Sequence, residues 1–157
     1  MSTGEQTIPV TVEDADPSDI ASLALCAWKE ARGEGLEGII AVMHVIGNRA
    51  VAGRTKGFAS TIHGVIYGKN QFTSMSVPSD PEFNLIPEAD DPTYGQCVAY
   101  AKQMLSAGAV LDDPTKNALY YANLHNIPLD GWFYRNIVLN TQMHPITAQI
   151  GKHTFFA

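Results

Sequence analysis

The most restrictive feature of this sequence is a segment near residues 37–50 that is apolar around most of a helical circumference. A helix with one apolar stripe lies on a surface, whereas a helix that is apolar on most sides must be covered by the rest of the chain. The segment therefore predicts a buried central helix around which the other elements pack. The residues that indicate it are Ile39, Val42, Met43, Val45 and Ile46.

A second helix is predicted directly before it, starting in the sequence D-A-D-P-S-D. Asp16 suits the capping position, Pro17 suits the first helical position, and Asp19 suits the positive end of the helix dipole. Apolar residues then recur at helical spacing up to Ala31, and the glycines at 33 and 35 end the helix. Two long helices thus flank the short acidic stretch K-E-A-R-G-E-G-L-E-G.

The rest of the chain predicts shorter elements. A short helix is expected over 60–67, a long surface loop over 70–92, and a third helix from Asp91-Pro92 to Gly108. The runs A-L-Y-Y-A, N-I-V-L-N and H-T-F-F-A beyond Pro114 are β-prone or irregular. We therefore predict an α+β fold dominated by helices, with residues 1–15 as a flexible tail and 16–157 as a single domain.

Charge and composition narrow the possible functions. Lys and Arg number 10 against 16 Asp and Glu, giving a net charge of −6, which does not suit a nucleic-acid binder. No apolar run reaches about 18 residues, so we expect no membrane insertion, and the N-terminus lacks the pattern of a secretory signal. Histidine and cysteine spacings predict no metal site and no cofactor. Cys26 and Cys97 both lie in apolar segments. They are either two buried free thiols or the two halves of a disulfide.

Glu30 is the candidate catalytic acid of the acidic stretch. It falls in the last turn of the first predicted helix, where the dipole disfavours a negative charge, and Cys26 and Trp28 indicate apolar neighbours. Both effects favour a carboxyl group that keeps its proton. Such a group can protonate a leaving oxygen, which is what glycoside cleavage requires.

Two other clusters leave alternatives open. Arg32 pairs with Glu34 or Glu37 as part of a solvated loop, or holds one of them ionised near the site. Aromatic and amide side chains gather after residue 117 and indicate either a sugar-binding groove or core and turn positions. They are Asn117, Tyr120, Tyr121, Asn123, Asn126, Trp132, Phe133 and Tyr134.

Taken together, these segments resemble the cell-wall hydrolase family that includes the spore-cortex-lytic enzymes. The resemblance begins with E-A-R-G-E-G-L-E-G-I-I-A-V-M-H-V-I-G-N-R and continues through F-A-S-T-I-H-G-V-I-Y and Gln71-Phe72. It ends with A-L-Y-Y, Trp132 and I-G-K-H-T-F-F, so that it spans roughly residues 20–157. The resemblance implies a lysozyme-like fold, similar to goose-type lysozymes and lytic transglycosylases.

The resemblance also implies cleavage of the β-1,4 bond between N-acetylmuramic acid and N-acetylglucosamine in peptidoglycan glycan strands. It places Glu30 as the catalytic acid/base, because Glu30 opens the E-[AS]-R-G-E motif. A hydrolytic muramidase would add a second carboxylate or a held water. Only unsupported loop candidates are available for that role, namely Asp80, Glu82, Glu88 and Asp130, which favours a lytic transglycosylase.

Supporting roles follow by the same resemblance. Gln71 and Phe72 would line the floor of the groove, with Tyr121 and Trp132 as further substrate-binding residues. Tyr120 would orient the catalytic carboxyl group, Asn123 would contact an acetamido group, and Glu34 would orient the loop or assist as a second acid. Asn48 and Arg49 are interpreted as a structural cap with a buried salt bridge.

Several alternatives stay open at this stage. The chain could be a hydrolytic muramidase, a zinc-dependent N-acetylmuramoyl-L-alanine amidase, or a non-catalytic phage structural or wall-binding protein. A catalytic domain without a signal fits a phage endolysin, held in the host cytoplasm until its release to the wall or periplasm, or a virion-associated lysin. We expect a monomer, although the sequence does not determine the oligomeric state.

Overall fold

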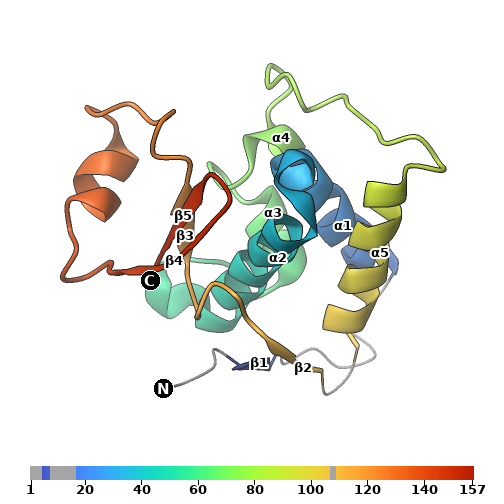
Figure 1. Ribbon diagram of the computed structural model, residues 1–157, viewed down its shortest axis with the longest axis horizontal. Coiled ribbons are helices and arrows are strands. Elements are labelled where there is room, and N and C mark those ends of the chain that lie inside the picture. Colours follow the sequence, from blue (N-terminus) through green and yellow to red (C-terminus); the bar gives the residue numbers. More distant parts are fainter. Residues whose placement is uncertain (1–4, 8–16, 107–108) are drawn as a thin grey trace.

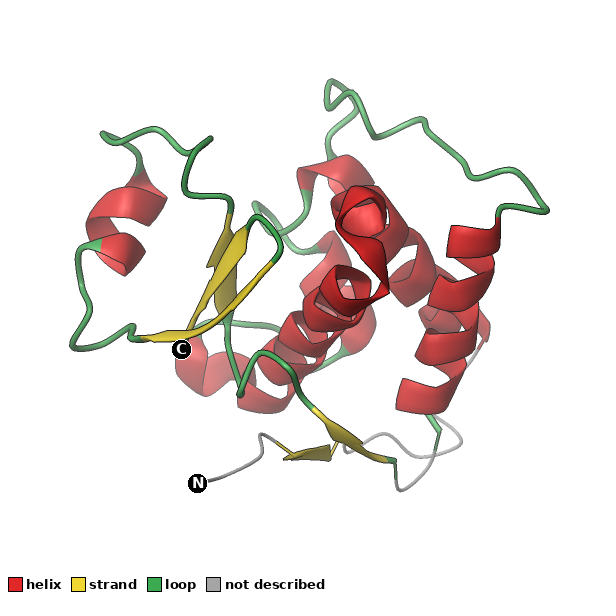
Figure 2. Cartoon of the chain, viewed as in Figure 1, coloured by secondary structure: helices red, strands yellow, loops and turns green. Residues whose placement is uncertain are grey.

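The computed structural model describes residues 5–7, 17–106 and 109–157 of the chain. Most of the helices form one group, a small antiparallel sheet stands beside it, and one further helical turn lies on the far side of the sheet (Figures 1 and 2). The α+β, helix-dominated class predicted from the sequence is therefore confirmed. Part of the predicted tail, Glu5–Thr7, forms strand β1, which pairs with β2 (Val110–Asp112). Residues 1–4 and 8–16 lie outside the described part, and the domain boundaries stay a prediction.

The helices begin and end close to their predicted limits. They are α1 (Pro17–Ala31), α2 (Gly35–Ala52), α3 (Ile62–Tyr67), α4 (Thr73–Ser76) and α5 (Pro92–Met104), with 3-10 turns at Arg32–Glu34 and Gly53–Lys56. Asp91 caps α5 by accepting a 2.9 Å hydrogen bond from the backbone of Tyr94, as the Asp-Pro signal predicts. Gly108, where the sequence placed the end of this helix, lies outside the described residues.

Helix α2 is the central helix, as its composition predicts. One side packs with α1, α3 and α5 around a core that includes Leu23, Met43 and Met104. The other side packs on the sheet through Ala41 and Val45, which contact a cluster that includes Phe155. A helix covered on both sides needs apolar residues around most of its circumference, which explains the sequence pattern.

The sheet lies between this helical group and the segment 123–145 (Figure 1). Its strands are β3 (Tyr120–Ala122), β4 (Ile146–Ile150) and β5 (His153–Phe156), arranged antiparallel in the order β3-β5-β4. Tyr121 pairs with Phe155 across the first two strands. This register decides which side chains of β3 face α1.

Three local expectations need correction. The run N-I-V-L-N is not a strand: its first three residues end a π-helical turn, Tyr134–Val138, in which Ile137 is buried. One turn of helix, α4, interrupts the predicted loop of 70–92. Strand β4 was not predicted, although Ile146–Ile150 carries β-branched residues at its ends. These elements are short, so tertiary contacts outweigh their intrinsic propensities.

The two cysteines are buried free thiols. Burial raises the pKa of Cys97 to about 11 and raises that of Cys26 well above its usual value. No helix in the described residues combines the length and apolarity that a bilayer span requires. Among those same residues, no three His, Cys, Asp or Glu side chains converge as a metal site would require.

Candidate active site

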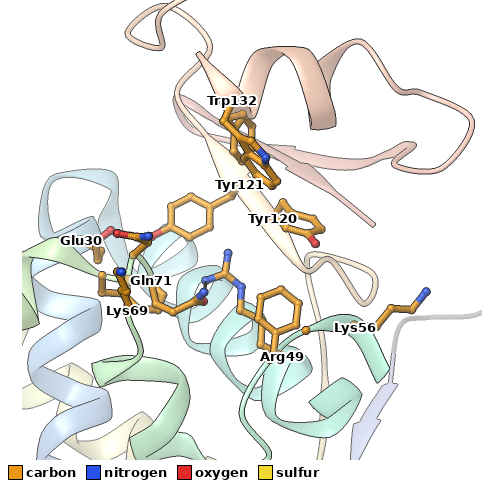
Figure 3. Close-up of a pocket in the computed structure, with 13 residues that line it drawn as sticks. Glu30, Arg49, Lys56, Lys69, Gln71, Tyr120, Tyr121 and Trp132 are labelled. Carbon is orange, nitrogen blue, oxygen red and sulfur yellow. Dashed lines mark hydrogen bonds between the residues drawn. The ribbon is translucent and has the colours of Figure 1, made fainter. Parts of the chain in front are cut away.

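A cavity of about 830 Å³ opens between the helical group and the sheet. Figure 3 shows Tyr120, Tyr121 and Trp132 on one side, Glu30, Arg49, Lys69 and Gln71 on the other, and Lys56 at the edge with its side chain directed outward. Its lining comes from α1, α2, the two loops around α3, and the segment that contains β3. The lining residues are Glu30, Arg49, Lys56, Gly57, Phe58, Lys69, Asn70, Gln71, Phe72, Tyr120, Tyr121, Trp132 and Phe133.

Glu30 occupies the last turn of α1, where the sequence placed it, and its carboxyl group is half-buried. The Tyr121 hydroxyl donates a 2.8 Å hydrogen bond to Oε1. The Ser74 hydroxyl donates a 2.9 Å hydrogen bond to Oε2. These partners lie 91 and 44 residues along the chain. The carboxyl group is thus held in a fixed orientation at the cavity wall by two hydroxyl donors.

The hydroxyl that orients Glu30 belongs to Tyr121 and not to Tyr120, which the sequence analysis had assigned to this role. Tyr120 also lines the cavity, but its ring packs on Phe58 at 5.9 Å and on His144 at 5.1 Å between centroids. Burial, followed by the charge of Glu30, raises the pKa of the Tyr121 phenol well above its usual value. Tyr121 therefore stays a hydrogen-bond donor at neutral pH.

Arg49 forms the floor of the cavity, and the sequence analysis expected it in a buried salt bridge that is not found among the described residues. Its Nε donates a 2.7 Å hydrogen bond to the Leu119 carbonyl, and its Nη1 donates a 3.0 Å bond to Gln71 Oε1. The guanidinium also lies over the rings of Phe58 and Phe72, at 5.1 and 5.5 Å from their centroids. Burial lowers the pKa of Arg49, yet a guanidinium remains charged in proteins. Neutral acceptors and aromatic rings compensate this buried cation.

Asn48 anchors the segment that leads into β3. Its Nδ2 donates 2.9 Å hydrogen bonds to Asp113 Oδ2 and to the Ala118 carbonyl. Asp113 is 1% exposed and also accepts from the backbone and hydroxyl of Thr115, at 2.8 and 2.7 Å. Full hydrogen bonding is what makes a buried carboxylate tolerable. This network connects α2 to the turn before β3 and so helps to bring Tyr121 to Glu30.

The other predicted binding residues divide into two groups. Gln71, Phe72 and Trp132 line the cavity, with Trp132 63% exposed at its edge. Glu34 and Asn123 lie outside the lining: Glu34 Oε2 accepts a 3.1 Å hydrogen bond from the Lys152 backbone, and Asn123 Oδ1 accepts one of 3.1 Å from the backbone of His125. Contact between these two residues and a substrate stays a prediction.

Glu34 connects the start of α2 to the turn between β4 and β5. A Cβ atom at Gly151 would lie only 2.3 Å from Glu34 Oε2, and Gly151 has a φ of +58°. Glycine suits this position on both counts, because it tolerates positive φ and allows the close approach.

The loop carboxylates considered as a second acid also lie away from the cavity. Glu82 forms a two-pronged ion pair with Arg32, whose guanidinium stacks on Trp28 at 4.3 Å from the ring centroid. The expected pairing of Arg32 with Glu34 or Glu37 is therefore wrong. Asp80 accepts a 2.8 Å hydrogen bond from the Glu82 backbone. Among the described residues that line the cavity, Glu30 is the single carboxylic acid.

The electrostatics of the cavity differ from those of the whole chain. The chain carries a net charge of −6. The cavity lining instead combines three cations, Arg49, Lys56 and Lys69, with the one carboxyl group of Glu30. Such a local excess of positive charge favours a ligand that carries acidic groups.

Comparison with known proteins identifies the family. The sequence model of the cell wall hydrolase family matches residues 33–156. The chain belongs to this family. The matched segment starts three residues after Glu30, so the match itself does not cover the candidate acid.

Two solved structures are similar to this chain in sequence and fold. The catalytic domain of a germination-specific lytic transglycosylase from Bacillus anthracis has a TM-score of 0.63 at 30% identity, covering 90% of this chain and 96% of that one. The catalytic domain of the Bacillus cereus SleB protein has a TM-score of 0.64 at 28% identity, covering 97% and 98%. Membership of this family and its fold, predicted from the motifs, are therefore confirmed.

Curated relatives point the same way. A spore cortex-lytic enzyme of Oceanobacillus iheyensis is 33% identical over 88% of this chain and 41% of its own length. A spore cortex-lytic enzyme of Bacillus subtilis is 32% identical over 88% of this chain and 37% of its own length. The chain thus spans less than half the length of the curated relatives it matches.

The sequence analysis missed Ser74, as it missed the cavity cations Lys56 and Lys69. Ser74 lies in a stretch rich in polar loop residues, and nothing in its neighbourhood distinguishes it from the other serines there. It reaches Glu30 because the chain around α4 folds back against the end of α1.

Proposed function

We propose that this chain degrades peptidoglycan, cleaving the β-1,4 bond between N-acetylmuramic acid and N-acetylglucosamine as a lytic transglycosylase. The observation that carries the proposal is the isolated carboxyl group of Glu30 at the wall of the cavity, oriented by two hydroxyl donors. Similarity to a lytic transglycosylase catalytic domain over 90% of the chain supports the reaction class.

The mechanism uses Glu30 twice. In its protonated form it donates its proton to the glycosidic oxygen while positive charge develops at C1 of the muramoyl residue. The bond between C1 and that oxygen breaks, and the departing sugar leaves with a new hydroxyl group. The ionised Glu30 then removes the proton from the muramoyl O6 hydroxyl, and O6 bonds to C1 to close a 1,6-anhydro ring. The cycle returns the proton to Glu30 and consumes no water.

The surroundings of Glu30 suit this sequence of steps. Tyr121 and Ser74 each donate to a different carboxyl oxygen, so the group keeps its orientation when its charge changes. No second carboxyl group among the described lining residues is available to activate water, which favours the transglycosylase product over the hydrolytic one. The exposed Trp132 ring and the half-buried Tyr120 ring offer flat surfaces on which sugars can pack.

The cations of the cavity suit the acidic parts of peptidoglycan. Muramic acid carries a lactyl group whose carboxyl end is either free or extended by a peptide stem with its own carboxylates. Lys56 and Lys69 are exposed in the lining and can meet such groups. Longer-range attraction also raises the local concentration of an anionic polymer.

Mass spectrometry of digested peptidoglycan tests the proposal. A lytic transglycosylase releases anhydromuropeptides, a muramidase releases reducing muropeptides, and an amidase releases free stem peptides. Glu30→Gln is expected to fold normally and to lower kcat at least about a hundredfold, as loss of a general acid would. Glu37→Gln removes an exposed carboxyl group of the same acidic stretch and serves as the matched control.

Each alternative has its own signature in this experiment. Reducing muropeptides or free stem peptides as the main product would overturn the transglycosylase assignment. Binding to peptidoglycan without any soluble product would indicate a non-catalytic wall-binding protein. Wild-type turnover in Glu30→Gln would remove Glu30 from the mechanism.

A further inference from the structure

Lys29, next to Glu30 in α1, has an unusual environment for a lysine. It is 8% exposed, and its Nζ donates hydrogen bonds to the backbone carbonyls of Ser74, at 3.1 Å, and Phe83, at 2.8 Å. The ammonium also lies 5.8 Å from the centroid of the Phe83 ring. Burying an ammonium is costly unless its donors are satisfied, so this arrangement indicates a specific task.

The task concerns a segment with little structure of its own. Helix α4 is a single turn, and residues 77–91 form a long irregular loop before α5. A single helical turn is unstable in isolation. Its position against α1 must therefore come from tertiary contacts, and Lys29 contacts both α4, through Ser74, and the loop, through Phe83.

Ser74 connects this attachment to the catalytic carboxyl group. Its carbonyl accepts from Lys29, and its hydroxyl donates to Oε2 of Glu30. Residues 29 and 30 point about 100° apart around the helix, so they approach Ser74 from different directions. Ser74 is thus held in place through its backbone carbonyl and contacts Glu30 through its side-chain hydroxyl.

The contacts of the Lys29 ammonium group lead to Ser74 and Phe83: it donates to the carbonyl groups of both residues and lies near the Phe83 ring. Ser74 in turn donates its hydroxyl to Glu30. The route from Lys29 to Glu30 therefore passes through the placement of Ser74.

We infer that Lys29 and Ser74 are positioning residues for Glu30: Lys29 fixes α4 against the end of α1, and Ser74 thereby holds one oxygen of the catalytic carboxyl group. This inference rests on the proposed function. It assigns a role in turnover to a buried lysine that lies outside the cavity lining. Arg32, in the 3-10 turn after α1, forms an ion pair with Glu82 that also supports the loop without touching Ser74.

A double-mutant cycle on the full chain tests the inference. Lys29→Met keeps the apolar stem and removes the ammonium, and Ser74→Ala removes the hydroxyl. Each change is expected to lower kcat about tenfold and to leave KM within about twofold, because the carboxyl group loses its alignment while the cavity lining is unchanged. The double variant is expected to be no slower than Ser74→Ala alone, because both changes remove the same hydrogen bond.

Lys102→Met is the matched control, since it removes the charge of an exposed helical lysine in α5. Turnover by the wild-type chain and its loss in Glu30→Gln test the proposed function separately, before the cycle is interpreted. Thermal unfolding of each variant separates a loss of folded protein from a loss of kcat.

Three results would overturn the inference. Additive losses in the double variant would mean that Lys29 acts by another route, and a change in KM alone would indicate substrate binding. Wild-type kcat in Ser74→Ala would remove the hydroxyl from the mechanism, and this holds even if Lys29→Met fails to fold.

Discussion

Tyr121→Phe is the most discriminating single change at this site. It deletes the hydroxyl that donates a 2.8 Å hydrogen bond to Glu30 Oε1 and leaves the ring in place. The ring keeps its stacking on Phe155, at 5.7 Å between centroids, and its edge contact with His153, at 5.0 Å. The fold should therefore be preserved, and the variant isolates the effect of one hydrogen bond on the carboxyl group of the proposed catalytic acid.

The size of the effect follows from the charge on the acceptor. A hydrogen bond to an ionised group contributes about 1.5–3 kcal/mol, and about 1.4 kcal/mol corresponds to a factor of ten in rate. If the bond acts fully in the transition state, kcat falls roughly 10- to 100-fold. Ser74 still holds Oε2, so some orientation of the carboxyl group remains.

The assay is steady-state release of soluble muropeptides from purified peptidoglycan, with kcat and KM determined separately. Tyr120→Phe is the matched control because it makes the same chemical change at the neighbouring residue of β3, which also lines the cavity. Its hydroxyl does not contact Glu30, so we expect its effect on kcat to be at least about fivefold smaller than that of Tyr121→Phe.

The reasoning is refuted if Tyr121→Phe turns over at the wild-type rate, or if Tyr120→Phe loses more kcat than Tyr121→Phe. The second outcome would restore the role that the sequence resemblance gave to Tyr120. A large fall in the unfolding temperature of Tyr121→Phe would instead show that the hydroxyl stabilises the fold.

Two further predictions concern charge. Replacing Lys56 and Lys69 together with Met is expected to raise KM about three- to tenfold at low salt and to flatten the dependence of KM on salt, because exposed charges attract an anionic polymer through screened fields; an unchanged salt dependence would contradict this. Burial lowers the pKa of His44, and the charge of Asp113 opposes the shift. Near pH 6.5 the His44 imidazole therefore binds a proton more readily in the unfolded chain than in the folded chain. Stability is therefore expected to fall as pH drops through that range, by at most about 1.4 kcal/mol per unit from this group, and denaturant unfolding should show a shallower fall in His44→Gln.

The helices were predictable because their signals are local. Periodic apolar residues, the Asp91-Pro92 start of α5 and the glycines after α1 each act within a few residues along the chain. The place of Glu30 in the last turn of α1 follows from the same signals. The sequence also predicted that α2 is covered on both sides, because a helix that is apolar around its circumference is buried and does not lie at a surface.

The two tyrosines show where sequence reasoning stops. Adjacent residues of a strand point to opposite faces, and a shift of one residue in register exchanges their surroundings. Pairing of β3 with β5 sets Tyr121 opposite Phe155 and turns its hydroxyl toward α1. The residues Tyr120 and Tyr121 alone contain no information on that register.

Arg49 and Ser74 were misjudged or missed for a related reason. The partners of Arg49 are a backbone carbonyl 70 residues away and a side chain 22 residues away, which no local pattern specifies. Ser74 is one polar residue among many in its stretch. Its proximity to Glu30 exists only because the chain around α4 packs against the end of α1.

The amino-acid sequence by itself thus determined the helices, the central core helix and the position of the candidate acid Glu30, because each depends on neighbours within a few turns. Tertiary packing alone decided which hydroxyl groups hold that acid, which cations surround it, and which carboxylates are kept away. Those choices depend on contacts between segments tens of residues apart, and only the folded chain brings such segments within hydrogen-bonding distance.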